Sequence, residues 1–227
     1  MEQRPGQEKP MQVSNKGAPQ TLGGTKLKIA EAAMATLKTR GFAGTSAREI
    51  ASTGGFNQAL IFYHFGSVQM ALLAALDLVS TRRMDAYSPA FEQARTIPEL
   101  VALARDIYVE DLQNGYVTML GEMVAGGVAD AELGGAVAAR LQPWIDMVES
   151  KLRELVSGSP FESMLAPDDV AFAIVALYLG VDMLSHLEGD HTRAESLLAL
   201  GERFAPLLGA LLPSRPQGEP HEHRHRP

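Results

Sequence analysis

The sequence predicts an all-α protein, and three kinds of observation support this fold class. Apolar residues recur at helical spacing through most of the chain, as at Leu27, Ile29, Ala33 and Leu37. Capping signatures stand where helices are expected to begin, and glycines stand where they are expected to end. No segment alternates apolar and polar residues with a period of two over a useful length. Helices are therefore expected throughout.

The first expected helix spans residues 25–40 and ends at Gly41. A second, short helix begins around Ser46 and Glu49, which stand three apart in a capping-box spacing. Glycine adopts the left-handed conformation without a steric cost, so Gly54-Gly55 is expected to end this helix. The connection to the next helix is therefore a tight turn.

A third short helix is expected after Asn57, whose side-chain oxygen can cap its first amides. The apolar seam that holds the two short helices together would consist of Ile50, Phe56, Ile61 and Phe65. Two short helices joined by a tight glycine turn are typical of the helix-turn-helix motif, which lays its second helix in the major groove of DNA. Residues 25–72 are thus expected to form a DNA-binding domain of three helices.

The rest of the chain is expected to form a larger helical domain over residues 73–212. Asn114-Gly115 is expected to close one of its helices, Gly126-Gly127 to loosen the next, and Pro143 to bend the one after that. Residues 1–24 and 213–227 are polar and are expected to be a disordered arm and tail. The remaining helices are expected from Ser67 into the mid-80s and over residues 96–113, 116–128, 131–156, 167–188 and 192–212.

The segment from Thr45 to Ser67 resembles the tetracycline-repressor (TetR) family of bacterial transcriptional regulators. The family's motif positions are filled by Thr45, Ser46, Ile50, Ala51, Gly55, Phe56 (for Val), Asn57 (for Ser), Ile61, Phe62 (for Tyr), His64, Phe65 and Ser67. The preceding stretch from Ile29 to Phe42 is similar to the family's first helix. The resemblance covers about residues 25–75. It implies a dimer that binds a palindromic operator and is released by a small molecule bound in the body.

Two residues depart from the family pattern. The family commonly has tyrosine at the position of Phe62 and lysine at the position of Val68, and both commonly reach phosphate oxygens. Phe62 lacks the hydroxyl group and Val68 lacks the charge. The resemblance therefore leaves open a second reading, in which a helical dimer binds a ligand or a protein partner with weak or lost DNA binding.

The outer face of the third helix and the start of the second are the expected DNA contacts. Gln58 is the first candidate for a base contact, because its amide can pair with adenine through two hydrogen bonds. Ala59 and Leu60 would contact thymine methyl groups, and the resemblance assigns Tyr63 and His64 to phosphates. The alternative for these last two is packing or plain exposure to solvent. The full expected set is Thr45, Ser46, Arg48, Asn57, Gln58, Ala59, Leu60, Tyr63 and His64.

The charge is unevenly distributed along the chain, whose net charge is −7 at pH 7. Residues 24–66 hold five basic and two acidic side chains, a net charge of +3. Residues 67–227 hold 12 basic and 23 acidic side chains, a net charge of −11. A basic end on an acidic body would orient the molecule on DNA through its electric field. The alternative is a random fluctuation in surface charge.

The last two expected helices are candidates for a dimer interface. Residues 170–181 are apolar on every face, so this helix has to be covered on more than one side. The last helix repeats large apolar residues every seven positions and small ones every four, which allows another helix to approach closely. The alternative is an ordinary core within one chain. The expected interface residues are Leu197, Gly201, Phe204, Ala205, Leu208 and Leu211.

The resemblance also implies an effector pocket in the body. Methionine and aromatic side chains suit a small apolar or aromatic ligand, because methionine repacks around irregular shapes. The alternative for each of them is plain core packing. The candidate lining residues are Tyr108, Met119, Met123, Trp144, Met147, Phe172 and Tyr178. Ligand bound there would tilt the helix that follows Ser67 and so change the separation of the two DNA-reading helices.

Other classes of function find little support in the sequence. There is no cysteine, no glycine-rich phosphate loop, no nucleophile elbow and no His-Glu-x-x-His spacing. We therefore expect no enzyme, no cofactor and no metal site, and a cytoplasmic location. The tail segment His221-Glu-His-Arg-His225 could hold a metal ion, but an alternating tail of this kind is usually solvated.

Overall fold

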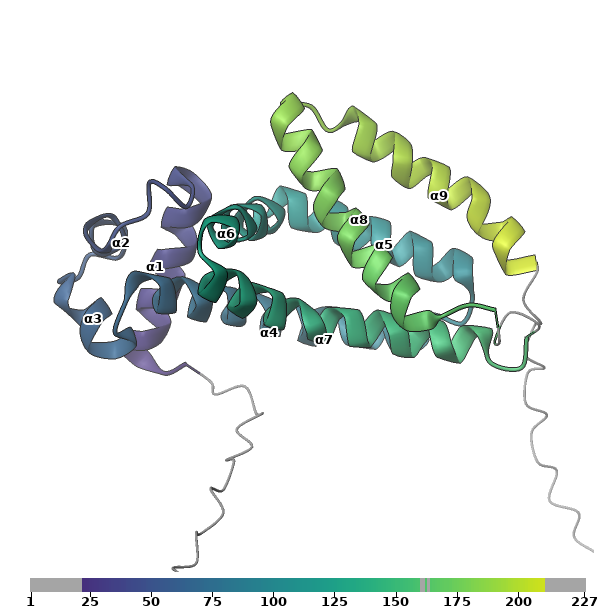
Figure 1. The fold of residues 1–227 in the computed structure, drawn as a ribbon, viewed down its shortest axis with the longest axis horizontal. Helices are drawn as coiled ribbons and strands as arrows, with labels where there is room; N and C mark the ends of the chain where they lie inside the picture. The colour runs from purple at the N-terminus through teal and green to yellow at the C-terminus, as the bar shows by residue number, and fades with distance from the viewer. Residues whose placement is uncertain (1–21, 160–161, 163, 211–227) are drawn as a thin grey trace, which may run out of the picture.

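The computed structural model describes residues 22–159, 162 and 164–210, which form nine α-helices and no strand (Figure 1). The all-α fold class is confirmed. The expected tail, the expected arm up to residue 21 and the interface residue Leu211 lie outside the described residues. The helices are α1 (Gly24–Arg40), α2 (Ala47–Gly54), α3 (Ala59–Phe65), α4 (Val68–Gln93), α5 (Ile97–Gln113), α6 (Tyr116–Ala129), α7 (Ala131–Val156), α8 (Pro167–Glu188) and α9 (Thr192–Ala210).

Helix α4 is longer than the sequence predicts. It was expected to end in the mid-80s, but it continues through Pro89 to Gln93. Packing of its last turn explains the difference, because Phe91 is buried in the far part of the core. The Nζ of Lys151 on α7 also donates to the carbonyl of Ala94 at 3.2 Å, which satisfies one of the groups left open at a helix end. These contacts outweigh the hydrogen bond that proline removes.

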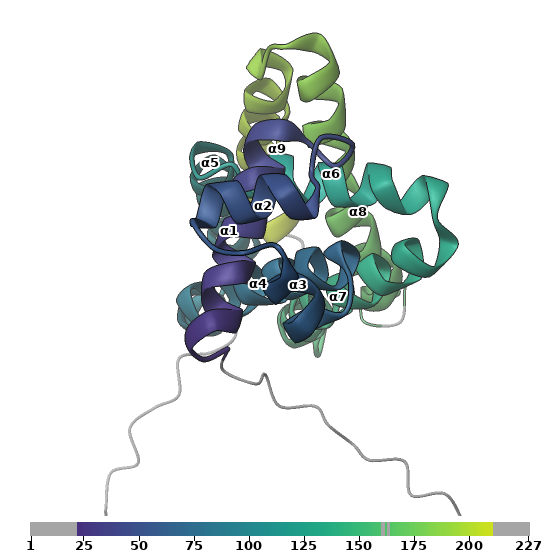
Figure 2. The ribbon, with the colours of Figure 1, turned by 90° about the vertical axis from the view of Figure 1, so that its left-hand side faces the viewer.

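The helices form an elongated molecule with the three short N-terminal helices at one end (Figure 1). Helix α4 leads from this end along the body and packs against α1 and α7. The α8–α9 hairpin lies at the other side of the body, where α8 contacts α7 and α9 contacts α5. Figure 2 looks onto the end formed by α1, α2 and α3. The two expected functional regions therefore lie apart and are joined mainly by α4 and α6.

A continuous apolar core joins the N-terminal helices to the body. Its residues come from α1, α2, α3, α4, α6 and α7, and they include Ile29, Ile50 and Ile61, which have no exposed surface, together with Met123 of α6. A second cluster lies at the far end of the body and includes Phe91, Leu100, Ile107, Val148, Leu152 and Ala171. Because protein interiors are close-packed, a shift of α4 or α6 has to displace the N-terminal helices as well.

Two glycines on α6 set close contacts with neighbouring elements. A Cβ added to Gly127 would lie 2.8 Å from the Cα of Gly134 on α7, so these two helices touch through their backbones. A Cβ added to Gly126 would lie 2.7 Å from the ring of Phe42, in the loop after α1. The pair that was expected to loosen α6 therefore fixes its distance from two neighbours.

One observation bears on membrane association. Among the described residues no single helix is both long and apolar enough to cross a bilayer. Helices α3 and α4 taken together are long and apolar enough by length and composition alone, and they are bent by 69° at their break.

Candidate DNA-binding surface and ligand cavity

The turn between α2 and α3 is built by local hydrogen bonds and one left-handed glycine. The hydroxyl oxygen of Ser46 accepts a hydrogen bond from the amide of Glu49 at 3.3 Å and so begins α2. Gly55 ends α2 with a φ of 63°, a conformation that residues with a side chain rarely adopt. The Oδ1 of Asn57 then accepts from the amide of Ala59 at 2.9 Å. The sequence predicted each of these contacts.

Helix α3 is fixed by one face and exposed on the other. Ile61 has no exposed surface and anchors the helix in the core. Tyr63 is 82% exposed, and its ring lies edge-on to that of His64 with centroids 4.9 Å apart. Gln58 and Ala59 are exposed at the start of the helix. A rigid exposed helix of this kind can enter the major groove of DNA.

Among the other predicted DNA contacts, Arg48 is accessible, whereas Leu60 and Thr45 are less available than predicted. Arg48 on α2 is exposed and borders the same shallow depression as Asn57 and Gln58. Leu60 is half-buried against the core and has less surface for a base contact than predicted. The hydroxyl of Thr45 donates to the carbonyl of Gly41 at 2.7 Å, so its donor is already used.

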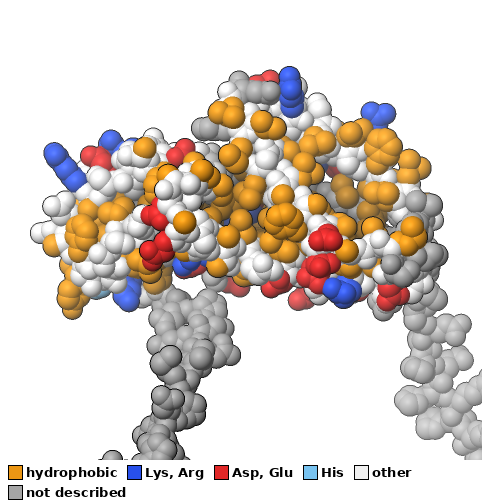
Figure 3. Space-filling model, in the orientation of Figure 1, with side chains coloured by type: hydrophobic (Ala, Val, Ile, Leu, Met, Phe, Trp, Pro, Cys, Tyr) orange, Lys and Arg blue, Asp and Glu red, His pale blue; other side chains and the backbone are white. Residues whose placement is uncertain are grey.

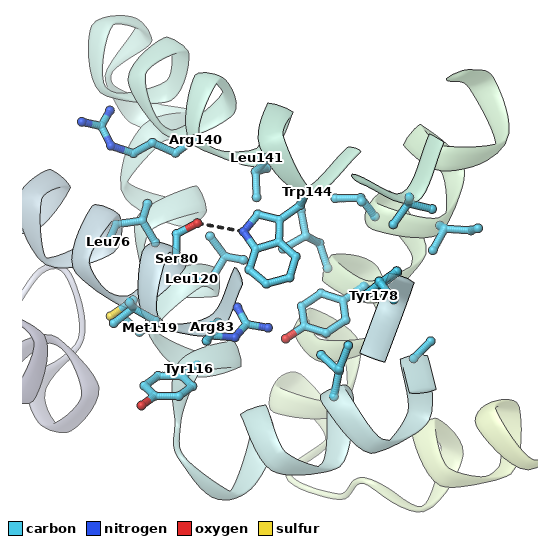
Figure 4. Close-up of a pocket in the computed structure, with 18 residues that line it drawn as sticks. Leu76, Ser80, Arg83, Tyr116, Met119, Leu120, Arg140, Leu141, Trp144 and Tyr178 are labelled. Atoms are coloured by element: carbon cyan, nitrogen blue, oxygen red, sulfur yellow. Dashed lines mark hydrogen bonds between the residues drawn. The ribbon is translucent and has the colours of Figure 1, made fainter. Parts of the chain in front are cut away.

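A mostly apolar cavity lies in the body between α4, α5, α6, α7 and α8, with a volume of about 110 Å³. The Nε1 of Trp144 donates to the hydroxyl of Ser80 at 2.8 Å, which uses the one hydrogen-bonding group of the indole (Figure 4). The residues labelled in Figure 4 come from four of these helices: Leu76, Ser80, Arg83, Tyr116, Met119, Leu120, Arg140, Leu141, Trp144 and Tyr178.

One of the two arginines that line this cavity belongs to a buried cluster. Arg83 forms an ion pair with Asp111 of α5, whose side chain has no exposed surface. The hydroxyl of Tyr178 on α8 donates to the same carboxylate at 2.8 Å. The guanidinium carbon of Arg83 also lies 4.6 Å from the ring centroid of Trp144. Three distant segments are thus held together by one carboxylate and one guanidinium.

Helix α6 connects the cavity wall to the N-terminal helices. Tyr116 lines the cavity, and the Nζ of Lys38 on α1 lies 4.1 Å from its ring centroid. The same Nζ donates to the carbonyl of Asn114 at 2.8 Å, while burial lowers the pKa of this ammonium group. Further along α6, the Oε2 of Glu122 accepts from the amide of Phe42 at 2.6 Å. A displaced Tyr116 would therefore act directly on α1.

A comparison with models of protein families shows which type of DNA-binding region this is. Residues 29–76 match the family model described as bacterial regulatory proteins of the tetR family. The N-terminal domain is therefore of the TetR type. The matched range begins within α1, includes α2 and α3, and ends in the first part of α4, so it coincides with the exposed helix and its supports.

Solved structures of TetR-family regulators share this fold along most of the chain. The fatty acid degradation regulator FadR from Bacillus halodurans has a TM-score of 0.69 and 16% identity, covering 84% of this chain and 98% of its own. A TetR-family regulator from Cytophaga hutchinsonii has a TM-score of 0.67 and 14% identity, covering 80% of this chain and 93% of its own. A TetR regulator from Legionella pneumophila has a TM-score of 0.65 and 18% identity, covering 81% of this chain and 98% of its own. A sequence comparison with curated proteins finds no match.

The two departures from the TetR pattern have different surroundings. Phe62 is 51% exposed on α3 and could still pack against a sugar or a base. Val68 is the first residue of α4 and is half-buried against the core. The hydroxyl of Ser67 caps α4 by accepting from the amide of Met70 at 3.1 Å. The first amides of this helix can meet a phosphate without the lysine.

The predicted pocket residues fall into two groups. Met119, Trp144 and Tyr178 line the cavity. The other four lie elsewhere: Tyr108 and Met123 are buried in the core, Met147 is half-buried in the far cluster, and Phe172 is 62% exposed on α8. Sequence reasoning missed Ser80 and Arg83. A signal for Arg83 was present, because it continues the apolar stripe of Leu72, Leu76 and Val79 at spacings of four, three and four.

Most of the large apolar side chains that are exposed among the described residues lie on the α8–α9 hairpin, and Figure 3 shows apolar side chains there. Leu197, Phe204 and Leu208 of the predicted interface are 38%, 53% and 55% exposed. The small-residue stripe faces inward instead, because Ala205 is 1% exposed and a Cβ on Gly201 would contact Val101 of α5. The stripe that was expected to admit a partner helix is therefore occupied by α5 of the same chain. The exposed residues of α8 are Phe172, Ile174, Leu177, Met183, Leu184 and Leu187.

Proposed function

We propose that this chain is a homodimeric transcriptional repressor that binds a palindromic operator and is released from it by a small apolar or aromatic effector. Residues 25–72 form its DNA-binding domain, and residues 73–212 bind the effector and the second subunit. It acts in the cytoplasm, where bacterial DNA lies. The observation that carries this proposal is the exposed α3, supported by Ile61, within a region that matches the TetR family.

The exposed face of α8 and α9 supports the dimer. Soluble monomers rarely expose contiguous apolar patches of more than a few hundred Å², and larger ones mark interaction sites. The patch includes Leu184, Leu187, Phe204 and Leu207, which are 53–80% exposed. Two copies of this hairpin would pack as a four-helix interface. A dimer also supplies the second α3 that a palindromic site requires.

The cavity supports the effector response. It is bordered by α4, which begins directly after the DNA-reading unit, and by α6, which contacts α1 through Lys38 and Tyr116. Ligand that displaces these walls would tilt α4 and change the spacing of the two α3 helices. A coupling free energy of about 1–3 kcal/mol would lower operator affinity roughly 5–150-fold.

Gln58→Ala is expected to relax the sequence preference at one base position and to cost about 1–3 kcal/mol of operator binding. The amide of Gln58 is exposed at the start of α3 and can form two hydrogen bonds with adenine. Fluorescence anisotropy with the DNA upstream of the gene, and with single-base variants of it, measures the loss.

Gln113→Ala is the matched control, because Gln113 is exposed at the end of α5, outside the matched DNA-binding region. It should leave DNA binding unchanged. If Gln58→Ala keeps the wild-type base preference, the base contact is wrong. If the wild-type protein does not distinguish any operator from random DNA, the repressor proposal fails and the second candidate gains support. That candidate is a helical dimer with weak or lost DNA binding, and the specific observation in its favour is Phe62 and Val68 in place of two phosphate-binding residues.

A further inference from the structure

Two arginines reach the cavity, and they differ in how their donors are used. Arg140 is turned toward Asp77, with its Nη2 2.9 Å and its Nε 2.7 Å from the two carboxylate oxygens, and its Nη1 donates to the carbonyl of Ala136 at 2.8 Å. The Nε of Arg83 is buried and has no acceptor among the described residues. An unpaired buried donor costs free energy, and a ligand acceptor can recover it.

The charge of Arg83 is already balanced. Its partner Asp111 is fully buried, and the hydroxyl of Tyr178 stabilises the same carboxylate. A carboxylate brought in by a ligand would be desolvated beside this acid. Charge therefore disfavours an anionic ligand, although the guanidinium still offers a donor.

The shape of the cavity limits the size of the ligand and favours a ring. Its volume of about 110 Å³ is comparable with the engineered apolar cavity of roughly 150 Å³ that accepts benzene. The guanidinium carbon of Arg83 lies over the ring of Trp144, 4.6 Å from its centroid, and the Tyr178 side chain lies close to both (Figure 4). A planar molecule beside the indole would bring its edge to the guanidinium.

We propose that the cavity binds a compact, neutral, aromatic or apolar molecule with one hydrogen-bond acceptor, of which a ketone is the simplest form, and that Arg83 donates to this acceptor. The inference rests on the proposed function, since it takes the cavity to be the effector site. It goes further by naming the ligand's charge and polar group. The indole N–H of Trp144 is already used by Ser80, and the buried, unpaired Nε of Arg83 is the donor that determines the position of the acceptor.

Three probes of nearly the same shape test this ligand class with the full-length wild-type protein. Acetophenone carries a neutral acceptor, α-methylstyrene replaces the oxygen by a methylene group, and benzoate carries a negative charge. Isothermal titration calorimetry gives each dissociation constant. The fluorescence of Trp144, which is the single tryptophan of the chain, reports whether the probe enters the cavity.

Acetophenone is expected to bind roughly tenfold or more tightly than α-methylstyrene, because a hydrogen bond to a charged group is lost in the hydrocarbon. Benzoate is expected to bind at least about tenfold more weakly than acetophenone, because its charge is desolvated beside Asp111. Equal affinities for the ketone and the hydrocarbon would overturn the proposal. Tighter binding of benzoate, or no binding by any of the three probes, would overturn it as well.

A double variant, Arg83→Met with Asp111→Asn, tests the donor itself. Both charges are removed together, so no buried ion is left unpaired, and the asparagine oxygen can still accept from Tyr178. The variant is expected to bind acetophenone and α-methylstyrene with equal affinity. If the preference for the ketone persists, Arg83 is not the donor. Should the variant fail to fold, the comparison of the three probes on the wild-type protein decides the proposal by itself.

A separate measurement distinguishes this inference from the proposed function. Operator affinity is measured by anisotropy with and without saturating acetophenone. The expected affinity order of the three probes with unchanged operator affinity would reject the effector role and retain the ligand class. A fall in operator affinity caused equally by the hydrocarbon would retain the effector role and reject the ligand class.

Discussion

Replacing Phe204 by glutamate is expected to convert the dimer into a monomer. Phe204 is 53% exposed on α9 and is one of the exposed apolar side chains of the α8–α9 hairpin. Burial of a phenylalanine side chain contributes about 1.5–3 kcal/mol, and the variant loses this contribution in both subunits, about 3–6 kcal/mol in total. The dimer dissociation constant should rise by a factor of about a hundred or more. Sedimentation equilibrium measures it directly.

Val128→Glu is the matched control for this variant. Val128 is 85% exposed near the end of α6, away from the hairpin, so it makes the same change from an exposed apolar side chain to an acid. It should leave the dimer intact. A wild-type protein that is monomeric at all concentrations, or a Phe204→Glu variant that dimerises like the control, would show that this surface does not join two subunits.

Asp111→Leu is expected to destabilise the protein by about 3–5 kcal/mol. The substitution leaves the guanidinium of Arg83 without its counter-ion in a largely buried position and removes the acceptor of the Tyr178 hydroxyl. Breaking one side of a buried ion pair costs more than the pair itself contributes, because the remaining charge stays desolvated. Chemical denaturation followed by circular dichroism gives the free energy of unfolding.

Two further variants make this prediction specific to the ion pair. Asp106→Leu removes an exposed carboxylate from the same helix and should change the free energy of unfolding by no more than about 0.5 kcal/mol. Adding Arg83→Met to Asp111→Leu should restore much of the lost stability, since both charges are then absent. If the double variant is no more stable than Asp111→Leu alone, the loss has another cause.

Local signals in the sequence predicted the helix boundaries well. Ser46 accepts a hydrogen bond from the amide three residues later, as its capping-box spacing predicts, and Ser67 and Thr96 do the same at the starts of α4 and α5. Such contacts depend only on neighbouring residues. The end of α4 was predicted too early because it depends on Phe91 and Lys151, whose partners are remote in the sequence.

In the candidate sites, too, the sequence predicts what depends on neighbouring residues and misses what depends on residues remote in the chain. The seam and exposed face of α3 follow from helical periodicity and from the family pattern. Periodicity places Arg83 on the inner face of α4 but does not give its depth, because arginine is mostly exposed in proteins and this one is paired with Asp111, 28 positions away. The stripe containing Gly201 and Ala205 correctly indicated a close helix contact. The sequence could not indicate that the helix in contact would be α5 of the same chain rather than a partner's helix.

Selection of DNA from a random pool by the purified protein tests the central claim most directly. The account predicts enrichment of an inverted repeat, with half-site centres about 34 Å or a multiple of this apart, as two α3 helices on a twofold axis require. Sequencing of the bound fragments reveals the repeat. A pool without enrichment, or with a single unrepeated half-site, would contradict the account of a dimeric DNA-binding regulator.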